Sequence, residues 1–141
     1  MKRIFSVSYN HDLVHVWLIF LRIGVAALML THGIPKFMRL LEGNLNFGDP
    51  INLGPTVSFI LVNFSEFLCS LLILFGLGTR LATIPLIISC SVAAFVAHAD
   101  DPFGKKELLL LYILIYITLL VMGGGKYSID ALISPPKKRR R

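Results

Sequence analysis

The sequence has few charged residues for its length. Only 16% of its 141 residues are charged and 55% are hydrophobic, with a mean hydropathy of +0.75. Ordinary soluble domains carry about 25% charged residues. The composition therefore argues against a water-soluble domain and favours a membrane protein, and the length favours one compact domain.

Cysteine is nearly absent. Only Cys69 and Cys90 occur, both within apolar segments and without a CxxC motif or a histidine at ligand spacing. We therefore expect no disulfide framework, no metal site and no covalently bound cofactor, and interpret both thiols as packing residues. The sequence also has no flavin, iron–sulfur or haem motif.

Two features that could mislead are the amino terminus and the net charge. The chain begins Met1-Lys2-Arg3, but its first apolar run starts near Leu13 and is too long and too late for a cleaved signal peptide. Five of the residues behind the net charge of +6 form one basic run at 137–141, which no nucleic-acid motif accompanies. We interpret 135–141 as a basic cytoplasmic tail that touches anionic lipid headgroups, and expect no nucleic-acid partner.

Apolar residues are abundant and form four long segments, at about 14–34, 57–77, 81–99 and 107–122. A membrane span needs about 17–25 mostly apolar residues, so the first segment is an uncleaved span and the fourth is short. Glycines at 76 and 78 predict a tight turn, and the glycines at 123–125 end the last segment. The predicted fold is all-α, an antiparallel bundle of four transmembrane helices in a single domain, 1–134.

The distribution of basic residues predicts the orientation. Four spans place nine basic residues on the face that holds both termini and four on the other face, while Arg22 lies within a span. Positive charge normally stays in the cytoplasm, so we expect a multi-pass protein of the inner membrane with both termini cytoplasmic. The one long connection, at 36–56, should then be an external loop, folded back as a lid or a short hairpin.

Arg22 and Glu66 are the charged residues that need a partner within the membrane. Each such charge costs about 2.5–3.5 kcal/mol on insertion, and both residues fall near the predicted midplane. We therefore predict an ion pair between them, formed directly or through Asn63. Phe59, Asn63, Glu66 and Ser70 recur at helical spacing and should face the interior. The pair could fix helix register or act in substrate binding and proton transfer, and the pattern leaves both open.

A second polar cluster is expected at the external ends of the helices, from His32, Lys36, His98 and Glu107. Histidine, lysine and carboxylate groups at one level are what binding and protonation of a quinone headgroup require. These four residues are therefore the candidate quinone site, under the external loop. A bis-histidine haem is disfavoured, because neither histidine has a second one at stacking distance.

The motifs, taken in order, resemble the DoxX family. They are Arg22, then Thr31-His32-Gly33-Ile34-Pro35-Lys36-Phe37, then Glu66 ahead of Phe75-Gly76-Leu77-Gly78-Thr79-Arg80, residues 93–98, and Gly123-Gly124-Gly125-Lys126-Tyr127-Ser128-Ile129-Asp130. The resemblance implies a cytoplasmic cap made by Ser128 to Asp130 after the fourth helix. It also implies the membrane subunit of a quinone-linked oxidoreductase, or of a redox-stress complex.

Three functions follow as alternatives. In the leading one, this protein supplies the membrane site for a quinone while a soluble redox partner supplies the electrons. The others are a small proton-coupled transporter, and a membrane anchor or scaffold without catalysis. The sequence leaves open whether the protein is itself catalytic, although lipid contact and a homo-oligomer are compatible with each alternative.

Overall fold

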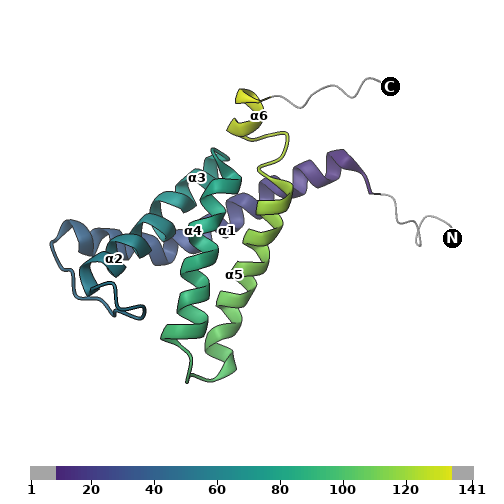
Figure 1. Ribbon diagram of the computed structural model, residues 1–141. Coiled ribbons are helices and arrows are strands. Elements are labelled where there is room, and N and C mark those ends of the chain that lie inside the picture. The colour runs from purple at the N-terminus through teal and green to yellow at the C-terminus, as the bar shows by residue number, and fades with distance from the viewer. Residues whose placement is uncertain (1–8, 135–141) are drawn as a thin grey trace.

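The computed structural model describes residues 9–134, and every regular element in that range is helical (Figure 1). The order is α1 (His11–Leu41), α2 (Pro55–Asn63), the π-helix η1 (Phe64–Cys69), α3 (Ser70–Phe75), α4 (Thr79–Val92), the π-helix η2 (Ala93–Ala97), α5 (Phe103–Met122) and α6 (Ile129–Ile133). The predicted all-α class is confirmed. The predicted tail at 135–141, like Lys2 and Arg3, lies outside the described residues.

Three helical segments of the described chain are long and apolar enough to cross a membrane, namely His11–Leu41, Pro55–Phe75 and Thr79–Ala97. The second joins α2, η1 and α3, and the third joins α4 and η2. Helix α5 has 20 residues, but three charged side chains, Lys105, Lys106 and Glu107, occupy its first two turns. Large apolar side chains such as Phe20, Leu114 and Val121 are exposed along these helices, as expected where lipid is the solvent.

Helix α1 is longer than predicted. The side chain of Asn10 caps it by accepting from the N–H groups of Asp12 and Leu13, and the helix then continues through Pro35 to Leu41. A proline within a helix removes one backbone hydrogen bond without necessarily ending it. The expected loop at 36–56 therefore begins only at Glu42, and Lys36 lies on a helix. No strand occurs among residues 9–134, so the loop forms no hairpin.

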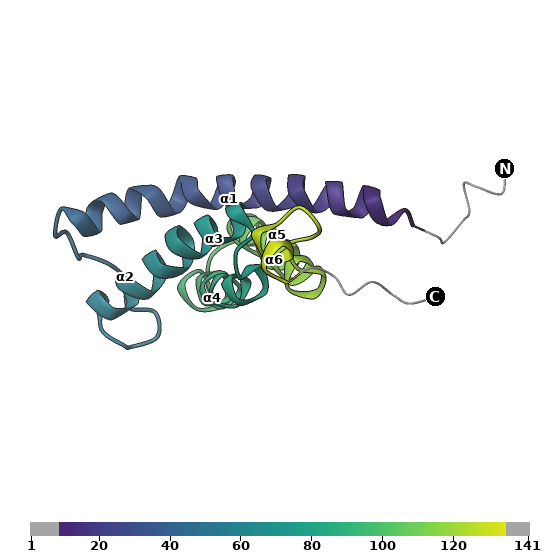
Figure 2. The ribbon, with the colours of Figure 1, turned by 90° about the horizontal axis from the view of Figure 1, so that it is seen from above.

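The helices pack as two pairs. Helix α1 lies against η1 and α3, and α4 lies against α5. In Figure 2, α1 extends lengthwise along one side while α4 and α5 are seen nearly end-on, so the two pairs cross. The core lies where they meet and includes Leu18, Val25, Met29, Cys69, Ile73, Leu86, Cys90, Tyr116 and Leu119. Cys69 and Cys90 are buried free thiols in this core, as their predicted packing role requires.

The segment after α5 folds back onto the turn between α3 and α4. The Asp130 backbone N–H donates to the Gly76 carbonyl at 2.9 Å, and the Asp130 carboxylate accepts from the N–H groups of Gly78 and Thr79 at 2.6 and 2.9 Å. Ser128 caps α6 by accepting from the Ala131 N–H at 3.2 Å. The cap that the sequence resemblance implied is therefore present, and it joins the chain after α5 to the start of α4.

Candidate functional site

The membrane carboxylate Glu66 is paired with Lys36. The Lys36 Nζ atom donates to both carboxylate oxygens, at 2.7 and 2.6 Å, and 27% of the Lys36 and 13% of the Glu66 side chain is exposed. The close approach of the two helices explains the contact. Gly33 on α1 lies so near the backbone of η1 that an added Cβ would sit 2.6 Å from the Glu66 carbonyl oxygen. Lys36 follows Gly33 by about one helical turn and therefore reaches Glu66.

The predicted Arg22–Glu66 pair is wrong. Arg22 is buried and donates instead to the carbonyls of Gly124 and Tyr127, at 3.2 and 3.1 Å. Because Glu66 lies beside Gly33, Arg22 is 11 residues away along α1, or about 16 Å at the helical rise. Asn63 forms no bridge, because its side-chain amide donates to the Phe59 carbonyl at 2.9 Å.

The polar face of the second helical segment does point inward, as predicted. Phe59, Asn63 and Ser70 are buried, and Glu66 is mostly buried. Glu66 lies within η1, and a π-helix changes the direction of the side chains that follow it. Such π-helical turns occur frequently at functional sites. The helical spacing could predict the face but gave no signal for the π-helix.

An apolar cavity of about 500 Å³ opens beside the ion pair. Three chemically reactive residues line it: Lys36 from α1, Glu66 from η1, and His98 at the end of η2. The remaining lining is mostly apolar and comes from the loop and from α2, η1, α4 and η2: Phe47, Pro50, Ile51, Ser58, Leu61, Val62, Phe64, Ser65, Pro85, Ile88, Ser89, Val92, Ala93 and Ala97. The expected lid is therefore present, because the loop supplies one wall of the cavity.

Asp49 holds this loop in place. Its carboxylate accepts from the Leu53 and Gly54 N–H groups, at 3.0 and 2.8 Å, and from the Ser58 hydroxyl at 2.8 Å. Phe47 packs on Phe59, with ring centroids 5.1 Å apart. These contacts fix the loop over the cavity by both polar and apolar interactions.

His98 is oriented by a carboxylate. Its Nδ1 atom lies 2.6 Å from Asp101 Oδ2, and Lys105 Nζ lies 3.2 Å from the other oxygen. Hydrogen bonds from His98 and Lys105 hold the pKa of Asp101 below its ordinary value, so this carboxylate is ionised. An ionised carboxylate can only accept, so the neutral His98 ring carries its proton on Nδ1. Its Nε2 is then left to accept a proton.

The predicted four-residue cluster is only partly assembled. Lys36 and His98 line the cavity, but His32 and Glu107 do not. His32 packs edge-on against Tyr112, with ring centroids 6.5 Å apart, and Glu107 is exposed on α5. Sequence reasoning assigned Glu66 to a different pair and so missed it as part of this site. Within residues 9–134, no group of three or more His, Cys, Asp or Glu side chains could hold a metal ion.

Comparison with known proteins gives one family. The family model described as DoxX matches residues 17–99. Two uncharacterized proteins of Haemophilus influenzae are similar: one is 34% identical over 62% of this chain and 61% of its own length, and the other is 32% identical over 81% and 88%. A putative oxidoreductase, CatD, of Bacillus subtilis is 26% identical over 84% of this chain and 87% of its own. No solved structure matches the chain.

Proposed function

This chain belongs to the DoxX family of membrane proteins, and from that premise we propose that it is the membrane subunit of a quinone-linked oxidoreductase or redox-stress complex. The observation that carries the proposal is the Lys36–Glu66 ion pair in the wall of an apolar cavity that His98 also lines. The similarity to a protein named as a putative oxidoreductase supports the same class of chemistry.

The proposed topology has four spans, with α5 as the fourth. Helix α5 packs along α4, and its apolar part, 108–122, extends over about 22 Å, so this span is short and needs little tilt or some local thinning of the bilayer. Its three charged residues then lie at the external interface, where long lysine side chains can reach the headgroups. Both termini are cytoplasmic in the inner membrane, in agreement with the excess of basic residues on that face.

The cavity suits a quinone headgroup in size and polarity. Small-molecule sites typically have volumes of about 300–1,000 Å³ and mostly apolar walls with a few polar groups. The apolar side chains of the lining would hold the ring, and Lys36 would donate a hydrogen bond to a quinone carbonyl. An apolar tail could extend from the cavity among the lipid-facing helices.

Quinone reduction takes up two electrons and two protons. The electrons would come from a soluble redox partner, since this sequence has no motif for a redox cofactor. His98 Nε2 and the Lys36–Glu66 pair would exchange the protons, with Asp101 holding the His98 ring in place through its Nδ1 atom. The transporter alternative is weaker, because a cationic substrate would have to displace Lys36 from Glu66.

Gentle purification followed by extraction of bound lipids tests the proposal. We expect a quinone in a roughly equal molar amount with the parent, and much less with the double variant Lys36→Met and Glu66→Leu, which leaves no unpaired charge. Glu107→Gln is the matched control, because Glu107 is an exposed carboxylate outside the cavity. If the parent protein folds but carries no quinone, even after incubation with excess quinone, the quinone site is wrong. The function as a membrane anchor without catalysis would then be favoured.

A further inference from the structure

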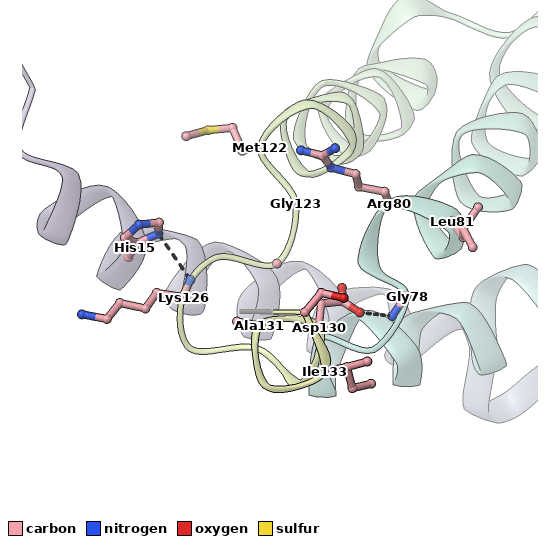
Figure 3. Close-up of a pocket in the computed structure, with 12 residues that line it drawn as sticks. His15, Gly78, Arg80, Leu81, Met122, Gly123, Lys126, Asp130, Ala131 and Ile133 are labelled. Carbon is pink, nitrogen blue, oxygen red and sulfur yellow. Dashed lines mark hydrogen bonds between the residues drawn. The ribbon is translucent and has the colours of Figure 1, made fainter. Parts of the chain in front are cut away.

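A second cavity, of about 650 Å³, lies at the start of α4, whereas the proposed quinone site lies along the later part of α4 and η2; Figure 3 shows the residues that line the second cavity. Its walls come from α1, the start of α4, the end of α5 and α6, so segments far apart in the sequence meet around it. We propose that this cavity binds the phosphate headgroup of an anionic phospholipid. The inference is independent of the proposed quinone chemistry, with which it shares no lining residue.

The charge of the lining favours an anion. Arg80 and Lys126 both line the cavity, and His15 adds a ring N–H. The His15 Nδ1 atom accepts from the Lys126 backbone N–H at 3.3 Å, so the proton of the neutral ring is on Nε2. These groups offer three kinds of donor to a phosphate oxygen.

The lining carboxylate does not cancel this charge. Asp130 already accepts from the N–H groups of Gly78 and Thr79, and it lies near the buried Arg22. Its negative charge is therefore balanced within the protein. Figure 3 shows Asp130 turned toward Gly78 and Arg80 extending toward the end of α5, while the Lys126 side chain lies at the rim and extends outward.

Arg80 is also held in position. Its Nη2 donates to the Val121 carbonyl at 3.0 Å, and its guanidinium packs against Gly123, where a Cβ would lie 3.3 Å from Arg80 Nε. Gly123 has a φ of 77°, which glycine adopts without strain. Arg80 Nη1 and Nε donate no hydrogen bond within the described chain. The guanidinium group is therefore held in position while two of its nitrogens can still donate to a ligand.

The rim of the cavity distinguishes a lipid from free phosphate. Leu81, Met122 and Ile133 line it and are 75%, 44% and 68% exposed. Apolar side chains next to cationic donors fit a ligand with a phosphate and acyl chains, whereas a free phosphate would gain nothing from them. The cavity lies at the start of α4 and the end of α5, and lipid headgroups lie at the same level as such ends of membrane-spanning helices.

The test measures lipid retention by native mass spectrometry after purification from vesicles of equal phosphatidylglycerol and phosphatidylcholine. The parent should retain phosphatidylglycerol preferentially. The double variant Arg80→Gln and Lys126→Gln should bind it roughly ten- to thirty-fold more weakly, because two interfacial cations are lost. The control Lys137→Gln with Lys138→Gln removes the same charge from the tail, which attracts anionic lipid without a cavity, and it should weaken retention much less than the cavity variant does.

Three results would overturn the proposal: no preference in the parent, a preference that survives in the cavity variant, or a preference lost only in the tail variant. Displacement of phosphatidylglycerol by inorganic phosphate at equal concentration would instead indicate a free-phosphate site, against the lipid assignment. Lys126→Gln alone guards against misfolding, because among residues 9–134 the Lys126 side chain makes only a cation–π contact with Tyr127. A folded single variant should still show part of the loss.

Discussion

The backbone of Gly33 lies directly against the backbone of Glu66, so that a Cβ on Gly33 would be 2.6 Å from the Glu66 carbonyl oxygen. This contact joins α1 to the π-helix η1 and sets which residue of α1 meets the membrane carboxylate. It also brings Lys36 within hydrogen-bonding distance of Glu66.

Replacing Gly33 should separate the two helices. Gly33→Leu should destabilise the protein by about 1–3 kcal/mol, the usual cost of overpacking, and should weaken the Lys36–Glu66 pair. Gly24→Ala on the same helix is the control, because no atom lies within 4 Å of its added Cβ. That control should be neutral or slightly stabilising. Unfolding in detergent measures both variants, and equal stability of parent and Gly33→Leu would contradict the packing.

The Lys36–Glu66 pair should show strong coupling in a double-mutant cycle. Glu66→Leu alone leaves Lys36 without its partner and should cost about 3 kcal/mol, at the lower end for buried pairs because Lys36 is partly exposed. Adding Lys36→Met should recover most of this loss. Adding Arg22→Met should not, because Arg22 binds backbone carbonyls elsewhere. Rescue by Arg22→Met would restore the original assignment of Glu66 to Arg22.

The sequence predicted well what depends on periodicity. Apolar segment length indicated the helices, and the spacing of Phe59, Asn63 and Ser70 correctly placed that face inside. The cap at Ser128 and Asp130 also followed from the family resemblance.

What the sequence could not show is which helices touch and at what level. The predicted midplane assumed that α1 ends near Ile34, whereas α1 continues through Pro35 to Leu41. The prediction therefore paired Glu66 with Arg22, although its partner in the structure is Lys36. One available signal was Gly33, since a glycine within an apolar helix often marks close backbone approach. The glycines at 123–125 were another, because they end the helix and leave backbone carbonyls open, and Arg22 donates to those of Gly124 and Tyr127.

Terminal reporter fusions check the proposed orientation. Alkaline phosphatase fused after Arg141 should be inactive, because it would remain in the cytoplasm, and a fluorescent protein at the same position should be active. Phosphatase fused within the loop after Glu42 should be active outside. An active phosphatase at the carboxyl terminus would mean either that the chain has three spans or that the bundle is inverted, and the loop fusion would then distinguish the two, because it is inactive only in the inverted bundle.

Arg22 should hold the segment after α5 against α1. Arg22→Met removes charged hydrogen bonds to the Gly124 and Tyr127 carbonyls and should cost about 2–3 kcal/mol. Arg22→Lys should recover little, because one ammonium cannot reproduce the two guanidinium nitrogens that bind these carbonyls. Limited proteolysis should then cut the chain faster after Met122 in both variants. Unchanged cleavage would mean that Asp130 alone holds the segment.

The cap at Asp130 should make stability depend on pH in a predictable direction. Burial opposes ionisation of this carboxyl, but hydrogen bonds from Thr79 and Gly78 and the nearby Arg22 charge outweigh it, so the pKa of Asp130 lies below its ordinary value. A lowered pKa in the folded state contributes stability above the unfolded pKa, about 3.9 for aspartate, and the contribution is lost as pH falls through the folded pKa.

The stability difference between the parent and Asp130→Asn should therefore be full at neutral pH and should shrink below about pH 4. Measuring the free energy of unfolding of both proteins across this range isolates Asp130 from Asp49 and Asp101, whose pKa values are also lowered and which both proteins share. Asp12→Asn, at the exposed start of α1, controls for the loss of one surface carboxylate. A difference that stays constant with pH would mean that Asp130 acts through its shape alone, and that its charge does not stabilise the start of α4.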